Sequence, residues 1–224
     1  MKRLLLNGSP RGKNSNSRVV IGWLVEGFAA AGAEEPVIVD LAGRDGTMEA
    51  VEALRGADET LLVFPLYTDS MPGIVAAFTN ALADLEPGQL RGKRIGYVVH
   101  SGFPETLQTE PLAAYLARMS TRLGLVHLGT ARTGGSEPFR LNPMSGRSKT
   151  SDRFRSLGRC LVERGIFDPD ALTELAKFRQ LGPGLRILAR ILAPTGLLNM
   201  YWNVMLKRHG AYGRRFDRPY AVSE

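Results

Sequence analysis

Five short apolar segments, separated by longer amphipathic ones, constrain the fold of this 224-residue chain more than any other feature. The apolar segments predict strands at residues 4–6, 36–41, 60–64, 94–100 and 125–131. Apolar residues at helical spacing predict helices at 17–31, 47–55, 73–85, 110–123 and 151–163. Strands that alternate with helices pair in parallel through right-handed crossovers. The sequence therefore predicts an α/β fold, a three-layer sandwich with a five-stranded parallel sheet.

The last quarter of the chain differs in charge from the rest. Up to residue 170 there are 20 Lys and Arg against 19 Asp and Glu, a net charge of +1; from residue 171 there are 9 against 3, a net charge of +6. This part exceeds what the sheet requires, and its pattern indicates helices interrupted by Gly and Pro. We expect a sheet domain over 1–165 and a basic, apolar helical C-terminal extension over 166–224.

Cysteine and histidine content excludes several classes of site. With Cys160 as its one cysteine, the chain has no disulfide framework, thiolate cluster or CxxC pair. The histidines, His100, His127 and His209, are too widely spaced for a local zinc motif, so we expect no metal.

Ligands of such sheets bind beyond the carboxyl ends of the strands, where the strand order reverses. The loops in that position are 7–17, 65–72 and 101–106. The first contains serines, asparagines, two glycines and two cations before a helix. Backbone N–H groups at a helix N-terminus, small hydroxyls and a nearby cation are what a terminal phosphate requires. The first loop therefore predicts a phosphate site.

Two common phosphate motifs do not match this loop. Three residues separate Gly8 from Gly12, whereas a Walker A loop has four, and Lys13 is not followed by Ser or Thr. The dinucleotide fingerprint G-x-G-x-x-G is absent, although Asp40 occupies the place of a ribose-binding acid, so that alternative stays open. A structural alternative is that Ser17 caps the first helix and the other polar residues form a solvated turn.

Residues 4–11, Leu-Leu-Leu-Asn-Gly-Ser-Pro-Arg, with Ser-Asn-Ser at 15–17, resemble the phosphate loop of the flavodoxin-like NAD(P)H-dependent FMN reductases. Loop 65–72 is similar to the Pro-x-Tyr-x-x-x-Met/Leu-Pro segment of that family, and loop 101–106 to its Gly-containing turn. The resemblance covers about residues 1–135 and implies a flavodoxin-like fold. It implies that the FMN phosphate is held by Ser9, Arg11, Ser15, Asn16 and Ser17. It further implies contacts to the flavin from Pro65, Leu66, Tyr67, Thr68, Met71, Ser101, Gly102 and Phe103.

The chemistry of the second and third loops agrees with a planar ring. Tyr67 and Met71 offer flanking surfaces, and Gly102 permits close approach of the backbone. The alternative is that Tyr67 and Met71 fill the core. A histidine at a strand end, such as His100, is more often a hydrogen-bonded structural residue than an acid or base, so no role is assigned to it.

The resemblance implies an enzyme that passes reducing equivalents from NADPH or NADH through bound FMN to a quinone, nitro or azo compound, flavin or other acceptor. Such chemistry needs no side-chain nucleophile, and we name no catalytic residue. The alternatives are a flavodoxin-type electron carrier or redox-partner protein without its own NAD(P)H turnover, and a flavin-free binding module. Flavodoxins are typically shorter and acidic, which favours the enzyme.

The basic extension bears on partners and location. Its helices are expected to cover the flavin face or a second subunit; the alternatives are a peripheral contact with an anionic membrane and a docking surface for a redox partner. We expect a homodimer and, because the body is nearly neutral, no nucleic-acid partner. The sequence shows no signal peptide and no apolar stretch long enough to span a membrane, so we expect a cytoplasmic protein.

Overall fold

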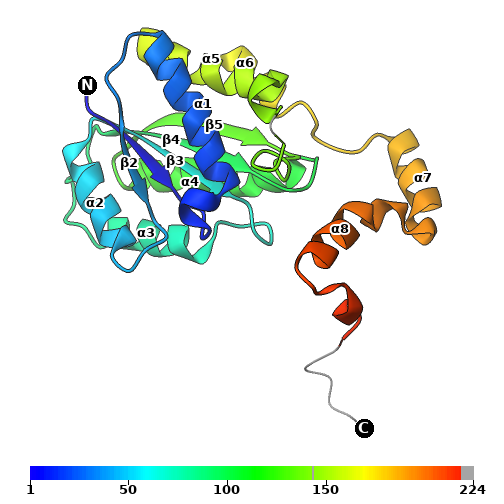
Figure 1. Ribbon diagram of the computed structural model, residues 1–224. Coiled ribbons are helices and arrows are strands. Elements are labelled where there is room, and N and C mark those ends of the chain that lie inside the picture. Colours follow the sequence, from blue (N-terminus) through cyan, green and yellow to red (C-terminus); the bar gives the residue numbers. More distant parts are fainter. Residues whose placement is uncertain (143, 218–224) are drawn as a thin grey trace. The chain divides into compact units, whose positions relative to one another are not determined.

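The computed structural model describes residues 1–142 and 144–217. The chain divides into two units, Met1–Gln180 and Leu181–Glu224. The first unit contains the sheet and the loops discussed above, and the second consists of short helices (Figure 1).

Five parallel strands form the centre of the first unit, in the order β2-β1-β3-β4-β5. The strands are β1 (Arg3–Asn7), β2 (Val37–Asp40), β3 (Glu59–Pro65), β4 (Arg94–His100) and β5 (Val126–Thr133). All seven residues of β3, the middle strand, are buried, because helices cover both faces of the sheet. This strand order is that of doubly wound flavodoxin-like sheets, so the predicted fold class is confirmed.

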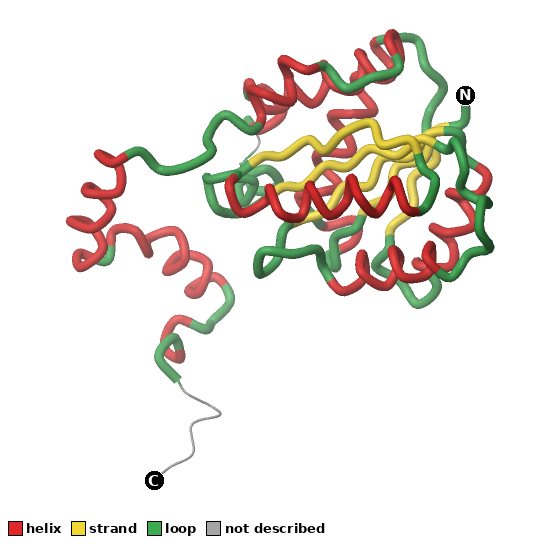
Figure 2. Tube along the Cα trace, turned by 180° about the vertical axis from the view of Figure 1, so that it is seen from behind, coloured by secondary structure: helices red, strands yellow, loops and turns green. Residues whose placement is uncertain are grey.

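Helices cover both faces of the sheet (Figure 2). On one face lie α1 (Asn16–Ala30), α5 (Lys149–Arg164) and α6 (Pro169–Leu175); on the other lie α2 (Gly46–Gly56), α3 (Gly73–Ala83) and α4 (Glu110–Arg122). The loops add the short 3₁₀ helices η1 (Gly12–Asn14), η2 (Leu107–Thr109) and η3 (Ser145–Arg147).

Helices α1 and α5 approach each other closely through two glycines. A Cβ atom on Gly27 would lie 2.2 Å from the carbonyl oxygen of Arg155, and one on Gly158 would lie 2.4 Å from that of Leu24. Both contacts are to backbone atoms, which cannot move aside as a flexible side chain does. The two helices therefore need glycine at both positions to pack as they do.

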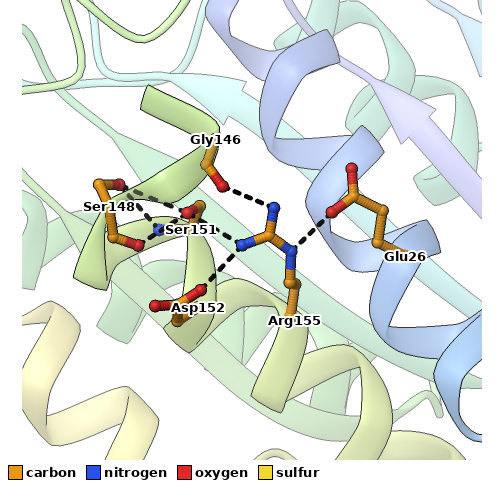
Figure 3. A network of polar contacts seen from close by, with 6 residues as sticks. All are labelled: Glu26, Gly146, Ser148, Ser151, Asp152 and Arg155. Carbon is orange, nitrogen blue, oxygen red and sulfur yellow. Dashed lines mark hydrogen bonds and ion pairs between the residues drawn. The ribbon is translucent and has the colours of Figure 1, made fainter. Parts of the chain in front are cut away.

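The guanidinium of Arg155 joins this helix pair to the loop that precedes α5 (Figure 3). Its Nε donates to Glu26 Oε2 on α1 at 2.6 Å, and an Nη donates to the carbonyl oxygen of Gly146 at 2.7 Å. The other Nη contacts Ser151 and Asp152 within α5. The loop after β5 is thereby fixed relative to α1, whose N-terminus belongs to the site described below.

The segment after α5 returns to the core of the first unit. Phe167, Ala171 and Leu175 are buried in the cluster under α1 and α5. The helical pattern over 168–181 predicts a longer helix than α6, which ends at Leu175. The chain leaves the helix there because the carbonyl oxygens of residues 178 and 179 accept hydrogen bonds from the backbone N–H groups of residues 106 and 107.

The second unit contains α7 (Pro183–Leu192), η4 (Ala193–Thr195), η5 (Leu197–Asn199), α8 (Met200–Arg208) and η6 (Tyr212–Arg214). Pro194 and Gly196, the latter with φ at 73°, separate the two α-helices. No residue of α7 or α8 is buried. Within the described residues, no helix combines the length and apolar character that crossing a bilayer requires.

Candidate functional site

The loops that follow β1, β3 and β4 lie beside one another, because these strands are neighbours in the sheet. Backbone hydrogen bonds join them: Gly8 N–H donates to the Val63 carbonyl at 2.8 Å, and Leu66 N–H to the His100 carbonyl at 2.7 Å. The structure therefore places all three predicted loops at one edge of the sheet.

Asn7, the last residue of β1, holds the first loop in shape. Its side-chain amide donates to the Gly12 carbonyl at 2.8 Å and to Asp40 Oδ1 at 2.6 Å. Its Oδ1 accepts from the backbone N–H of Ser9 at 3.1 Å. The dinucleotide alternative assigns Asp40 to a ribose hydroxyl. In the structure, one oxygen of the Asp40 carboxylate is instead hydrogen-bonded to Asn7. These hydrogen bonds hold the loop in shape through Asn7 and Asp40, which are not among the proposed FMN-binding residues.

Ser15 is the N-cap of α1, and its Oγ accepts from the backbone N–H of Arg18 at 3.2 Å. The amides of Asn16 and Ser17, which begin the helix, have no acceptor within it and carry the positive end of the helix dipole. These groups are what an anion requires at a helix N-terminus.

Arg11 supplies the cation. Its side chain is exposed, and its guanidinium makes no hydrogen bond or ion pair with the described residues. Beside it, Ser9 and Ser15 are buried hydroxyl residues, each 2% exposed. Ser15 donates its one hydroxyl proton to the Gly12 carbonyl at 2.6 Å, so the donors left for an anion are the backbone amides, the Ser9 hydroxyl and one guanidinium. This donor set fits a terminal phosphate group.

The second loop is a tight two-residue turn. Tyr67 and Ser70 exchange backbone hydrogen bonds of 2.9 and 3.0 Å, and the two residues between them have left-handed backbone, Thr68 at φ 49° and Asp69 at φ 59°. Such φ values are costly for a β-branched residue and cluster at functional sites. A strained turn therefore lies where the flavin contact is expected.

The side chains of this loop divide between core and solvent. Leu66 and Met71 pack against the core on the α2–α4 side, and Pro65 is buried at the end of β3. Tyr67 is 45% exposed. Tyr67 and Met71 are the two residues expected to flank the flavin ring. Tyr67 is available at the surface, whereas Met71 is partly buried against the core.

The third loop presents an aromatic ring at the surface. Phe103 is 70% exposed, whereas Ser101 is buried and its Oγ donates to the Phe103 carbonyl at 2.9 Å. A Cβ atom on Gly102 would meet Glu137 Oε2 at 3.6 Å, an ordinary contact, so the packing around Gly102 does not itself require glycine.

His100 links three loops beneath the site. Its Nε2 lies 2.8 Å from Ser17 Oγ and its Nδ1 2.8 Å from Ser136 Oγ, and all three residues are buried. Ser136 donates its one hydroxyl proton to the Ser101 carbonyl at 2.9 Å, so it accepts from Nδ1–H, and Nε2 accepts from Ser17. Burial lowers the pKa of His100 from 6.5 to about 4. His100 is therefore a neutral residue whose two hydrogen bonds join the end of β4 to the start of α1 and to the loop after β5.

A fourth loop, residues 134–142 after β5, also reaches the site and was not among the predicted contacts. Asn16 Nδ2 donates to the Glu137 carbonyl at 3.4 Å, and Asn16 Oδ1 accepts from the Arg140 N–H at 3.1 Å. The side chain of Asn16 is therefore used to hold this loop, which leaves its backbone N–H for an anion. Gly134-Gly135-Ser136 directly after a strand was the available sequence signal.

Residues 1–121 match the NADPH-dependent FMN reductase family. The chain belongs to this family. It is accordingly an NAD(P)H-dependent FMN oxidoreductase, with FMN as cofactor and NADPH or NADH as co-substrate, as the sequence resemblance implied. A search of curated proteins finds no match to the chain.

Solved structures share the fold at low sequence identity. An NAD(P)H:quinone oxidoreductase from Methanothermobacter marburgensis has a TM-score of 0.56 and 17% identity, covering 71% of this chain and 95% of its own. An FMN-dependent NADH-azoreductase from Bacillus anthracis, in complex with FMN, has a TM-score of 0.54 and 15% identity, covering 73% and 100%. RosB with a bound flavin-phosphate intermediate has a TM-score of 0.54 and 14% identity, covering 100% and 91%. At these identities the likeness shows the fold alone.

Proposed function

We propose that the chain binds FMN at the edge formed by the loops after β1, β3 and β4, and passes electrons from NADPH or NADH to a small organic or flavin acceptor. The observation that carries this proposal is the first loop: a capped helix N-terminus, the buried Ser9 hydroxyl and the Arg11 guanidinium, which has no partner in the part of the chain that the structure describes. The names of two fold relatives support a quinone or an azo compound as the acceptor class.

The chain's own residues bind and orient the cofactor in this proposal. Arg11 neutralises the phosphate, and the first amides of α1 donate to it. Tyr67 and Phe103 border the ring, with their exposed side chains on separate loops. The remaining proposed contacts are Ser9, Ser15, Asn16, Ser17, Pro65, Leu66, Thr68, Met71, Ser101 and Gly102. When bound, FMN supplies the redox chemistry, so none of these residues is assigned a proton-transfer or nucleophilic role.

Anaerobic reduction of the reconstituted protein tests the proposal. The purified chain is loaded with FMN, and its absorbance is followed after addition of NADPH or NADH. We expect the flavin band to bleach within the time of a catalytic turnover and to return when a quinone or azo acceptor is added. A flavodoxin-type carrier would bleach only with a partner reductase, and a flavin-free module would bind no FMN.

We further propose that the chain is a homodimer and acts in the cytoplasm. The family resemblance supports the dimer, and the use of NAD(P)H, an intracellular reductant, supports the location. Light scattering of the FMN-loaded protein is expected to give twice the mass of one chain, and a mass of one chain would contradict the dimer.

A further inference from the structure

The second unit exposes apolar side chains at a much higher density than the first. Among the described residues, 21 large apolar side chains are exposed; eleven lie in residues 1–180 and ten in residues 181–217. The ten are Leu185, Ile187, Leu188, Ile191, Leu197, Met200, Tyr201, Trp202, Val204 and Phe216. Exposed apolar side chains at this density mark a site of interaction with another molecule or a membrane.

Helix α7 separates its apolar and basic residues onto opposite sides. Arg186 and Arg190 lie one turn apart, and at 100° per residue Leu188 and Ile191 fall on the other side of the helix, with Ile187 at the edge of that apolar side. All three apolar residues are 48–64% exposed. A short, basic, strongly amphipathic helix of this kind lies flat at a lipid–water interface.

Aromatic and basic residues are also combined in and after α8. Trp202 is 57% exposed, and Tyr201 packs edge-on against it with ring centroids 5.2 Å apart. Downstream, the guanidinium of Arg215 lies 4.0 Å from the ring centroid of Tyr212, and Lys207 Nζ lies 5.0 Å from it. Aromatic rings beside cations suit the headgroup region of a bilayer, where one end of a side chain is wet and the other is apolar.

The charge of the second unit selects the partner. Residues 181–224 contain seven Lys and Arg against two Asp and Glu, a net charge of +5, whereas residues 1–180 contain 22 against 20, a net charge of +2. A second copy of the unit would bring like charges together, and the body offers no strongly acidic balance to attract it. An anionic lipid surface is complementary in both charge and apolar character.

We propose that residues 181–217 form a peripheral membrane anchor that binds anionic bilayers, with Ile187, Leu188 and Ile191 facing the acyl chains and Arg190 and Lys207 near the headgroups. No helix of the described chain spans the bilayer in this arrangement. The proposal requires no flavin, so its failure and a failure of the proposed enzymatic function are separate results.

Trp202 provides a reporter inside the proposed anchor. The chain has two tryptophans, and the other, Trp23, is 4% exposed in the core under α1 and α5. The full-length protein is mixed with vesicles of phosphatidylcholine alone or with 30% phosphatidylglycerol added, a probe composition of about one anionic lipid in three. We expect the emission to shift to shorter wavelength and to be quenched by brominated acyl chains only with anionic vesicles, and less so at high salt.

Paired variants distinguish specific membrane anchoring from non-specific hydrophobic binding to vesicles. Ile187→Ser with Ile191→Ser is expected to weaken vesicle binding at least tenfold, and Arg190→Gln with Lys207→Gln to remove the preference for anionic lipid. Met48→Ser with Val126→Ser changes exposed apolar residues of the first unit and is expected to leave binding unchanged. Circular dichroism verifies that each variant is folded.

Three outcomes would overturn the proposal. They are the absence of a Trp202 response to anionic vesicles, equal losses in the anchor and control variants, and oligomerisation through the second unit in a protein that ignores vesicles. The last outcome would assign the apolar surface to a second copy of the chain.

Discussion

At the scale of single residues, Arg11 and Lys13 are two exposed cations in one loop for which the proposed site predicts different roles. Arg11→Ala is expected to weaken FMN binding by about ten- to a hundredfold, since a charge-assisted hydrogen bond contributes about 1.5–3 kcal/mol. Lys13→Ala serves as the control and is expected to change affinity by less than about threefold, because a solvated charge acts weakly. Fluorescence titration of FMN measures both, and equal losses would contradict the assigned role of Arg11.

His100 gives the site a predicted dependence on pH. Because burial lowers its folded-state pKa to about 4, below its ordinary 6.5, the stability that neutral His100 contributes is present above pH 6.5 and is lost as pH falls towards 4. The loss amounts to about 3 kcal/mol across this interval. His100→Asn is expected to flatten that part of the unfolding free energy curve and to weaken FMN binding about tenfold, because Ser17 loses its partner.

His127 supplies the control for this prediction. It lies at the start of β5, at the other end of the sheet, and His127→Asn retains His100. Burial, partly offset by a hydrogen bond with the Gly129 backbone, also lowers the pKa of His127, so His127 contributes a part of the acid-dependent loss. Chemical denaturation between pH 4 and 7 is therefore expected to show most of that loss in His127→Asn and much less of it in His100→Asn. A curve for His100→Asn that parallels those of His127→Asn and the natural chain would assign the pH dependence to other groups.

At the scale of elements, the contact between α1 and α5 predicts opposite effects on stability for alanine substitutions at two glycines of α1, Gly27 and Gly22. Gly27→Ala places a Cβ against the Arg155 carbonyl and is expected to destabilise the fold by about 2–3 kcal/mol. Gly22→Ala, in the same helix with nothing within 4 Å of the added Cβ, is expected to stabilise it by up to about 1 kcal/mol. Urea unfolding measures both changes, and a neutral Gly27→Ala would show that the helices can separate without cost.

The positions of the strands and of most helices could be predicted from local sequence pattern. A buried parallel strand is a continuous apolar segment, and an amphipathic helix repeats its apolar residues about every 3.6 positions. The predicted range 94–100 coincides with β4. The end of α6 was not predictable in this way, since residues 178 and 179 leave the helix for hydrogen bonds to a loop about 70 residues earlier in the chain. The link between His100 and Ser136 depends likewise on residues that only the sheet brings together.

The site was predictable where its chemistry is local. The predicted phosphate loop lies within 11 consecutive residues, 7–17, and this short stretch contains the hydroxyls, the cation and the helix-start amides. The contact between Asn16 and residues 137 and 140 joins segments more than 120 residues apart and gave no comparable signal. The sequence also did not show that Tyr67 is exposed whereas Met71 packs against the core, because the exposure of each side chain depends on how the turn packs rather than on residue type.

At the scale of the whole molecule, an enzyme domain joined to a membrane anchor is expected to reduce lipid-soluble acceptors faster than water-soluble ones when it is bound to a bilayer. If anionic vesicles hold the chain at the bilayer, turnover with a long-chain quinone dissolved in them is expected to exceed turnover in neutral vesicles about tenfold at low salt. A water-soluble azo acceptor serves as the control and is expected to be reduced at the same rate in both. Equal quinone rates in the two vesicle types would contradict a role of the second unit in acceptor choice.

The position of FMN in a crystal structure of the loaded chain tests the central claim most directly. We expect the phosphate at the N-terminus of α1, within hydrogen-bonding distance of the amides of Asn16 and Ser17 and of the Arg11 guanidinium, with the ring bordered by Tyr67 and Phe103. A cleft of about 680 Å³ lies on the β2 side of the same loop, between residues 10–13 and 42–46. A phosphate bound there, or FMN absent from both places at saturating concentration, would contradict the proposed site.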